Sequence, residues 1–309
     1  MGGDTPPQDL YSAVLQLIEE GVTASFVIFA SDEVAGALDS SLQFIKGCEV
    51  IHMDDDPALA IRRKKNASLC KGIALLHSKQ IDAFVTAGNT GALLLSATTT
   101  LSALPGIDRP ALLTLLPTKK KEVAVLDVGA NLTLQPQQLL QFAAMGIAYQ
   151  KSRGIAHPTV GLLNIGTEAT KGTPQLREAY THLETLGLET FLGNVEGKAV
   201  FNGDIDVLVT DGFTGNVFLK TSESVAAFIL DYLELTSRET ASHFKHEIST
   251  LNSRLYQAAS HGAILCGVEG IIIKCHGDAS AAVFRQGIKG AIRLCEHNFL
   301  ENIKSQLLL

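Results

Sequence analysis

The chain of 309 residues contains no tryptophan, and aromatic residues make up only 6% of it. Its five cysteines are an odd number, and no two of them have the CxxC spacing of zinc or redox motifs. We therefore expect reduced thiols that serve mainly in packing, without a disulfide framework or a bound zinc ion. They are Cys48, Cys70, Cys266, Cys275 and Cys295.

Long hydrophobic segments are also missing. The uncharged run between Gly88 and Ile107 is interrupted by serine and threonine, which suits a buried helix better than a membrane span. The first ten residues lack the basic and apolar regions of a secretory signal. Together these features predict a cytoplasmic protein.

Positive charge is in deficit, since 25 Lys and Arg against 32 Asp and Glu give a formal charge of −7. A general nucleic-acid binder needs a basic face, so we expect no nucleic-acid partner. One local exception is the basic run Arg62, Arg63, Lys64 and Lys65. It is either a solvated helix face or a docking surface for an acidic protein.

Several cofactor and nucleophile motifs are absent. No GxGxxG follows a strand, no GxxxxGK[ST] occurs, and no Gly-x-Ser-x-Gly elbow is present. His243 and His246 are three residues apart, but no third metal ligand is suggested near them. The sequence therefore favours a chemistry without metal, organic cofactor or covalent serine.

What the chain does contain is an alternation of apolar β-branched runs and helical segments, which predicts an α/β fold with a largely parallel or mixed sheet. The predicted strands are 24–30, 48–52, 82–86, 111–116, 122–127, 159–163, 189–192, 206–210 and 270–274. The predicted helices are 8–20, 33–44, 57–79, 91–103, 135–151, 174–186, 216–232, 236–258 and 279–304. The length allows one large core or two intertwined lobes, and we expect a single α/β catalytic domain over residues 1–309.

The segment 222–262 differs from the rest because it contains no strand and has apolar residues at helical spacing. It predicts a helical hairpin. The two helices either cover the sheet in the ordinary way or project for dimer or membrane contact.

The stretch from Asp206 to Lys220 reads as a short buried strand, a glycine-rich turn and a helix that starts near Asn216. Gly212 and Gly215 permit turns that a Cβ would resist. Open α/β sheets bind ligands at the carboxyl ends of their strands, and free N–H groups at a helix start favour an anion. This stretch therefore predicts a site for phosphate or another anion.

Similar glycine-punctuated strand ends recur, often with asparagine. Each alone is usually only a turn, but together they supply backbone and amide donors that could hold a polyanion. They are at 2–4, 87–91, 127–131, 164–172, 193–197, 211–216 and 274–277. Lys171 in one of them is either a charge-neutralising group or a surface lysine, and His276 is either a donor to an anion or leaving group or a structural histidine.

These motifs together resemble the bacterial phosphate acyltransferase family of phospholipid synthesis. The matching segments run from the start of the chain nearly to its end. They are MGGD (1–4), DPALAIRRKKNAS (56–68), TAGNTGALL (86–94), RPALLTLLPT (109–118), LDVGANLTLQPQQLLQFAAMG (126–146), VGLLNIGTEATKG (160–172), FLGNVEGKAVFNGDIDVLVTDGFTGNVFLKTSE (191–223) and GIIIKCHGDA (270–279).

The resemblance implies a reaction in which inorganic phosphate attacks the thioester of a long-chain acyl group on acyl carrier protein. The acyl phosphate product would feed a downstream glycerol-3-phosphate acyltransferase. It also implies a three-layer α/β/α fold similar to phosphotransacetylase and isocitrate dehydrogenase. The family associates as a homodimer and attaches peripherally to membrane, which would give the hairpin 222–262 its role. No cofactor is implied, since phosphate is a substrate.

The resemblance also suggests site residues. Lys171 and Asn216 would hold phosphate and transition-state charge, Asn89 would position the substrate, and His276 would support the oxyanion or leaving group. The basic run Arg62, Arg63, Lys64 and Lys65 would dock the carrier protein. Further phosphate- or substrate-binding positions are Asp4, Gly88, Thr90, Gly91, Asn131, Gly166, Gly212 and Gly215.

The chain departs from the family pattern in two places. The usual run of glutamates is Thr167-Glu168-Ala169-Thr170 here, so no catalytic role is transferred to it. The family also has a β-strand ending in Asp-Ala before MGGD, whereas this sequence starts at Met1. We expect that the natural start lies upstream or that the chain is truncated.

Three other interpretations remain open at this point. A phosphotransacetylase-like enzyme would use a coenzyme A thioester, a dehydrogenase of the same broad fold would change cofactor absorbance, and a non-catalytic scaffold would consume no acyl thioester. The missing dinucleotide motif argues mildly against the dehydrogenase, and the anion-site residues argue against the scaffold.

Overall fold

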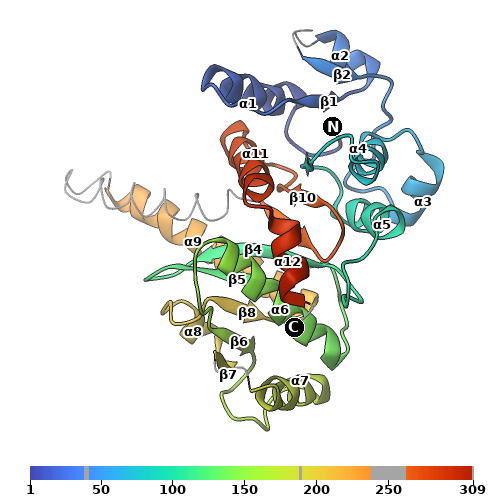
Figure 1. The fold of residues 1–309 in the computed structure, drawn as a ribbon. Helices are drawn as coiled ribbons and strands as arrows, with labels where there is room; N and C mark the ends of the chain where they lie inside the picture. The colour runs from blue at the N-terminus through green and yellow to red at the C-terminus, as the bar shows by residue number, and fades with distance from the viewer. Residues whose placement is uncertain (38–41, 188–189, 238–261, 308–309) are drawn as a thin grey trace. The chain divides into compact units, whose positions relative to one another are not determined.

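The computed structural model describes residues 1–37, 42–187, 190–237 and 262–307 (Figure 1). The chain divides into two compact units. Unit 1 comprises Met1–Pro110 and Ser260–Leu308, and unit 2 comprises Ala111–Ala259. The expectation of one catalytic domain over the whole chain stays a prediction.

Unit 1 is built around strands β3 (Ala83–Thr86), β10 (Ile271–Lys274) and β9 (Ala263–Cys266), in that order. β10 runs parallel to β3 and antiparallel to β9. A separate parallel pair is formed by β1 (Val27–Phe29) and β2 (Gln43–Ile45). The helices of this unit are α1 (Pro7–Glu19), α2 (Asp32–Ala37), α3 (Pro57–Arg63), α4 (Ser68–His77), α5 (Thr90–Thr100), α11 (Ala281–Glu296) and α12 (Phe299–Leu307).

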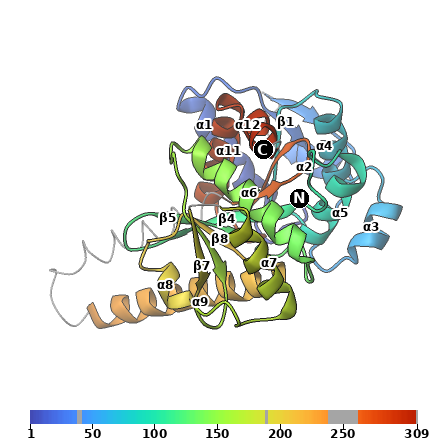
Figure 2. The same cartoon turned by 60° about the horizontal axis from the view of Figure 1, so that its bottom comes forward.

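Unit 2 contains the strand order β4-β5-β8-β6-β7. β4 and β5 are antiparallel, and β5, β8, β6 and β7 are parallel. Figure 2 shows α6 and α9 on opposite sides of these strands, so helices cover both faces. The elements are β4 (Ala111–Pro117), β5 (Glu122–Leu126), α6 (Pro136–Ser152), β6 (Val160–Leu163), α7 (Pro174–Thr185), β7 (Phe191–Val195), α8 (Gly197–Val200), β8 (Val207–Val209) and α9 (Gly212–Ser237).

Burial explains why these strands are continuous apolar runs. All the residues of β6, β8 and β10 are buried, as expected for parallel strands that are covered on both faces. In α6, Gly146 lets the helix approach the sheet, because a Cβ there would lie 2.3 Å from Cγ1 of Val207. The predicted α/β class with a mixed sheet is therefore confirmed.

Several predicted boundaries were wrong. The helix expected over 33–44 ends at Ala37, and β2 follows it, while 48–52 contains only an isolated bridge at Glu49. The helix expected over 57–79 is interrupted between Arg63 and Ser68, where Asn66 N–H donates to the Glu49 carboxylate at 3.0 Å. Tertiary contacts thus override local helix propensity here.

Two further differences lie near the carboxyl end. Strand β9 was not predicted, and the helix expected over 279–304 is two helices separated at Asn298, which has φ +49°. Only the first arm of the expected hairpin, α9 to Ser237, is within the described residues, so the hairpin stays a prediction. Among these residues, no helix is both long and apolar enough to cross a membrane.

Candidate active site

In unit 2, three loops follow the carboxyl ends of neighbouring parallel strands. Strand β8 lies between β5 and β6 and is parallel to both. The loops 127–131, 210–212 and 164–173 therefore leave the same edge of the sheet side by side. This is the edge at which α/β sheets bind ligands.

Asp127, directly after β5, is the buried anchor of this edge. Its side chain is 0% exposed. Oδ1 accepts the N–H groups of Leu112 at 3.0 Å, Gly129 at 3.1 Å and Ala130 at 3.0 Å. Oδ2 accepts from Asn131, from its N–H at 2.7 Å and its Nδ2 at 2.9 Å. The carboxylate thus holds the whole turn from Gly129 to Asn131.

Burial raises the pKa of Asp127 above its usual value, and the N–H donors oppose that rise. The 127–131 motif is recognisable in the sequence, but no role was predicted for Asp127. Its role could have been predicted from its position directly after an apolar strand. A carboxylate that is buried there needs several hydrogen-bond donors around it.

The start of α9 differs from the prediction. The helix begins at Gly212, four residues before Asn216, and neither Gly212 nor Gly215 has a positive φ. Their function is close approach: a Cβ on Gly215 would lie 1.9 Å from the Asp127 carbonyl oxygen, and one on Gly212 would lie 2.6 Å from that of Asn131. The two glycines let α9 sit directly on the Asp127 turn.

Several N–H groups of this helix start already have partners inside the protein. Gly212 N–H donates to the Asn131 carbonyl at 2.8 Å. Asp211 caps the helix by accepting from Thr214 N–H at 2.8 Å, and its carbonyl accepts from Gly215 N–H at 2.8 Å. An anion would therefore find fewer free backbone donors here than the sequence suggested.

Asn216 lies four residues after the start of α9 and is exposed. Its side-chain amide packs against Gly129, because a Cβ on that glycine would lie 2.8 Å from Nδ2 of Asn216. Gly129 also has φ +136°, which favours glycine. Asp127 therefore sets the position of Asn216 through the turn that it holds.

Lys171 lies on the loop after β6. Asn164 folds this loop by donating from Nδ2 to the Lys171 carbonyl at 3.2 Å and by accepting Ile165 N–H at 2.8 Å. From β7, Asn194 Nδ2 donates to the Glu168 carbonyl at 2.8 Å. Lys171 itself is exposed and has no ion pair with another described residue. Its ammonium is thus available on a loop that buried amides hold.

Gly166 lets the same loop fold tightly, because a Cβ at this position would lie 2.9 Å from the Glu168 carboxylate and 3.1 Å from Cγ of Lys171. No role was predicted for Asn164 or Asn194. Both are buried polar residues at strand ends. Their position in the sequence could have indicated a structural role, because buried polar groups are hydrogen-bonded.

In unit 1, the loops after the parallel strands β3 and β10 are also neighbours. The first residues of the chain lie between them: Asp4 N–H donates to the Gly277 carbonyl at 2.7 Å. A Cβ on Gly3 would lie 2.8 Å from that oxygen and 2.9 Å from the Ala87 carbonyl. Gly3 therefore lets the start of the chain approach the backbone at Gly277 and at Ala87, which precedes Gly88.

The Asn89 side chain is used structurally. It is 6% exposed, and its Oδ1 caps α5 by accepting Ala92 N–H at 2.9 Å. Its Nδ2 donates to the carbonyls of His52 and Met53, each at 3.1 Å, and of Asp55 at 3.3 Å. Asn89 thus holds the 52–55 loop against α5, which begins with Thr90 and Gly91, and its amide is occupied.

His276 is exposed after β10, and its Nδ1 contacts Oδ1 of Asp278. A carboxylate at this position fixes the orientation of the imidazole and leaves Nε2 as the second ring nitrogen for proton exchange. This geometry is compatible with the predicted role in leaving-group support, which stays a prediction.

The basic run is divided by its contacts. Lys64 Nζ pairs with Asp55 Oδ2 at 2.6 Å and donates to the Val50 carbonyl at 2.8 Å, so this lysine serves the local fold. The pair lowers the pKa of Asp55. Arg62, Arg63 and Lys65 are exposed, and they remain as the predicted docking residues.

The predicted site residues therefore form two groups. Unit 2 brings together Asn131, Gly212, Gly215 and Asn216, with Gly166 and Lys171 on the loop of the next strand. Unit 1 contains Asp4, Gly88, Asn89, Thr90, Gly91 and His276. That Lys171, Asn216, His276 and Asn89 act in one site stays a prediction.

The remaining candidate groups are histidines that could bind a metal and the five cysteine thiols. His243 and His246 lie outside the described residues. Within those residues, no three His, Cys, Asp or Glu side chains gather as a metal site. All five cysteines are free, and burial raises the pKa of Cys275 to about 12, which keeps it a thiol.

Comparisons with known proteins agree with this architecture. Residues 1–302 match the family described as fatty acid synthesis protein. A phosphate acyltransferase of Clostridium tetani is 37% identical over 324 residues, covering 99% of this chain and 96% of that protein. One of Thermotoga maritima is 37% identical over 314 residues, covering 99% and 94%.

Solved structures show the same fold at low identity. A phosphotransacetylase from Streptococcus pyogenes has a TM-score of 0.64 and 16% identity, covering 94% of this chain and 91% of that one. The EutD phosphotransacetylase from Staphylococcus aureus has a TM-score of 0.60 and 15% identity, with the same coverage of both chains. The predicted phosphotransacetylase-like fold is thereby confirmed.

Proposed function

Because the chain belongs to this family of fatty acid synthesis proteins, whose relatives are phosphate acyltransferases, we propose that it transfers a fatty acyl group to inorganic phosphate for lipid synthesis. The observation that carries this proposal is the unit 2 edge. There the exposed Lys171 and Asn216 are held on neighbouring loops by the buried Asn164 and Asp127.

The chemistry needs positioning more than a strong acid or base. A phosphate oxygen attacks the thioester carbonyl carbon, the carbon–sulfur bond breaks, and the sulfur leaves as a thiolate that then takes a proton. Phosphate is already an anionic nucleophile, and a thiol has a pKa of about 8.5. The protein must therefore hold the anion against the carbonyl and stabilise the oxyanion.

Lys171 supplies a positive charge and Asn216 an amide donor for phosphate. His276, oriented by Asp278, donates to the oxyanion or protonates the departing sulfur. Asn89 acts indirectly, by keeping the 52–55 loop on α5. The reaction requires no metal or organic cofactor, so a chelator should leave the rate unchanged.

The acyl donor is the thioester of acyl carrier protein. Support comes from Arg62, Arg63 and Lys65, which are exposed cations suited to an acidic partner. The acyl phosphate product would pass to a glycerol-3-phosphate acyltransferase, as the family resemblance implies.

The same proposal includes a homodimer and peripheral contact with membrane, to which α9 would contribute. This helix exposes apolar side chains at helical spacing, and such a stripe is typical of an interaction surface. They are Phe213 (61% exposed), Val217 (52%), Val225 (51%), Phe228 (68%) and Tyr232 (62%).

The test is phosphate-dependent release of the carrier-protein thiol from an acylated carrier protein. Lys171→Ala should lower turnover by about tenfold or more, the scale of losing one charge-stabilising donor. Lys119→Ala is the matched control, since Lys119 is exposed at the β4–β5 turn, the opposite end of β5. Normal acyl phosphate formation by the Lys171 variant refutes the role of Lys171 in the reaction. Faster turnover of acyl-coenzyme A than of acylated carrier protein refutes the carrier-protein thioester as the acyl donor.

A further inference from the structure

Three large apolar side chains are exposed on the loops of the unit 2 edge. Leu132, on the loop after β5, is 72% exposed, and Ile165, on the loop after β6, is 82% exposed. Phe213, at the start of α9 after β8, is the third. Because the strand order is β5-β8-β6, one such side chain follows each of three neighbouring strands. They belong to the same edge as Lys171 and Asn216.

Polar and apolar residues exchange their usual places on these loops. Asn131, Asn164 and Thr210 are buried, whereas the large apolar side chain that follows each of them by one to three residues is exposed. A single exposed apolar residue needs no explanation. The same inversion on three adjacent loops makes a patch, and such patches are typical of binding sites.

The backbone beside these apolar side chains is held by hydrogen bonds. Asn164 Oδ1 accepts the N–H of Ile165 at 2.8 Å. The residues directly before the other two side chains are joined to each other, since Gly212 N–H donates to the Asn131 carbonyl at 2.8 Å. The apolar surface is therefore formed before a ligand arrives, and binding to it requires little further ordering of the loops.

The size of this surface fits an aliphatic chain better than a protein partner. Three side chains of this kind offer on the order of 300 Å² of apolar surface, whereas a stable protein interface needs about 800 Å² from each partner. The exposed polar residues Thr133, Thr167 and Glu168 interrupt the surface between the apolar ones. A saturated chain has no hydrogen-bonding groups and requires only apolar contacts.

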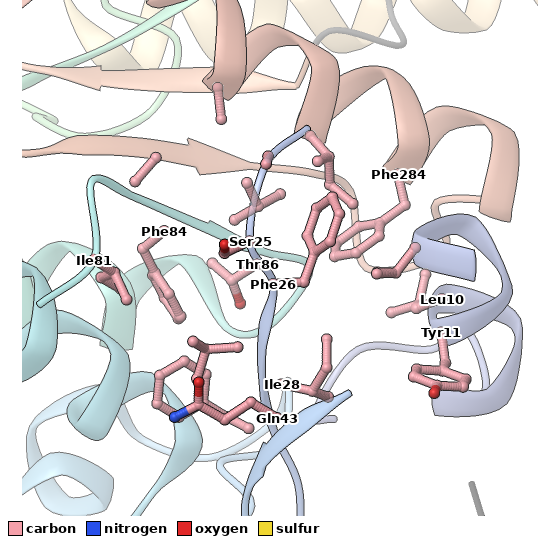
Figure 3. Close-up of a pocket in the computed structure, with 18 of the residues that line it drawn as sticks. Leu10, Tyr11, Ser25, Phe26, Ile28, Gln43, Ile81, Phe84, Thr86 and Phe284 are labelled. Atoms are coloured by element: carbon pink, nitrogen blue, oxygen red, sulfur yellow. The ribbon is translucent and has the colours of Figure 1, made fainter. Parts of the chain in front are cut away.

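Another apolar space is a cavity of about 620 Å³ in unit 1, where Phe26, Phe84 and Phe284 lie among the lining side chains (Figure 3). Two runs of consecutive residues, 23–30 and 80–87, also line it, so peptide groups face this space. Peptide groups need hydrogen-bond partners, which an aliphatic chain lacks. None of the residues assigned to the acyl transfer lies in this wall, so the unit 2 edge is the better place for the chain.

We propose that Leu132, Ile165 and Phe213 bind the part of the acyl chain nearest the thioester and so select long chains over short ones. This inference rests on the proposed function, which holds the reacting carbonyl at Lys171 and Asn216. Each methylene that leaves water on this surface should raise kcat/KM by up to about fourfold. The increase should end where the chain extends beyond the three loops.

The experiment measures kcat/KM for carrier protein loaded with butyryl or palmitoyl groups. The test variant is the double replacement Leu132→Gln and Ile165→Gln, which affects exposed side chains and leaves the core intact. Phe213 is kept, because it also belongs to the apolar stripe of α9. The matched control is Leu186→Gln, since Leu186 is 68% exposed and follows α7, which leads back to the opposite end of the sheet.

We expect the double variant to lower the ratio of kcat/KM for palmitoyl to that for butyryl by about tenfold, the loss of roughly two buried methylenes, and the control to keep the ratio. An unchanged ratio overturns the proposal. An equal loss for both donors also overturns it, because that result assigns the loops to carrier-protein docking or to the chemistry itself.

A second measurement does not depend on acyl transfer. A long-chain fatty acid with a photoreactive diazirine near its carboxyl group is crosslinked to the protein, and the products are mapped by mass spectrometry. Crosslinks in 126–135 and 164–173 that the double variant loses support the proposal. Crosslinks confined to the unit 1 runs 23–30 and 80–87, or to the α9 residues 225–232, overturn it.

Two further outcomes of the crosslinking are decisive. Crosslinks at the loops that disappear as the protein concentration rises overturn the proposal, because a second copy of the chain then covers the surface. Absence of acyl phosphate from every donor refutes the proposed function, while the crosslink map still decides where the acyl chain binds. The two failures are therefore distinguishable.

Discussion

Replacement of Asp127 by asparagine tests whether one buried carboxylate holds the unit 2 edge. The amide keeps the shape of the side chain but retains only one accepting oxygen. It can serve either the N–H groups of Leu112, Gly129 and Ala130 or the two donors of Asn131. At least two donors therefore lose their acceptor, and each buried unsatisfied group costs about 1–3 kcal/mol.

Two effects decide the net change. The lost acceptors alone predict a decrease of about 2–6 kcal/mol in the free energy of unfolding. The neutral amide is easier to bury than a carboxylate, whose pKa burial raises, so the lower end of about 2 kcal/mol is expected. Domains are typically stable by about 5–15 kcal/mol, so the variant should still fold. Urea unfolding measures the change.

Asp204→Asn is the control in the same unit. Asp204 pairs with Lys120, but its side chain is 58% exposed, and exposed pairs contribute about 0–1 kcal/mol. The reasoning is refuted if the Asp127 and Asp204 variants unfold at the same urea concentration. Because the Asp127 turn sets Asn216, turnover with phosphate should also fall in the Asp127 variant and remain normal in the control.

Gly215→Ala should destabilise the protein by several kcal/mol or shift α9, because its Cβ would lie 1.9 Å from a carbonyl oxygen. The control Gly36→Ala, with open space around the new Cβ, should be neutral or stabilising by up to about 1 kcal/mol. Thermal denaturation of the two variants measures the difference. Desolvation raises the pKa of Asp206, but hydrogen bonds from Lys121 and Thr159 outweigh it and lower the pKa overall. The stability that this carboxylate contributes is therefore present above the unfolded-state pKa of about 3.9 and is lost as the pH falls through the folded-state pKa. Asp206→Asn should flatten the profile of melting temperature against pH between about pH 5 and 2. Charge reversal of Arg63 and Lys65 should raise KM for acyl carrier protein with kcat unchanged. An unchanged KM would show that these residues do not dock the carrier protein.

Strand positions were largely predictable because buried parallel strands are short apolar runs. Eight of the nine predicted runs overlap a strand of the structure, and these strands are β1, β3, β4, β5, β6, β7, β8 and β10. Errors arose where a distant contact decides the backbone. The break between α3 and α4 depends on Glu49, which lies outside that helix in the sequence. Strand β9 depends on pairing with β10, which no local pattern indicates.

The candidate site shows the same division. Lys171 and Asn216 were found from glycine-rich strand ends, because anion sites need such loops. The residues that hold them were missed, because a buried carboxylate or amide is recognised by its partners and not by its neighbours in sequence. Asn89 was predicted to position the substrate, which stays a prediction, and only the structure shows that its amide donates to three carbonyls of the 52–55 loop.

By itself, the sequence determined the α/β class, the family and the loops that could hold an anion, because periodicity and glycine spacing are local properties of the chain. Only the tertiary structure decided what those loops do. Gly212 and Gly215 proved to serve close packing, since α9 rests on the Asp127 turn. Lys64 proved to be paired and Lys171 not, among the described residues. Such distinctions depend on which polar groups are buried together, and burial is set by the packing of segments that are far apart in the chain.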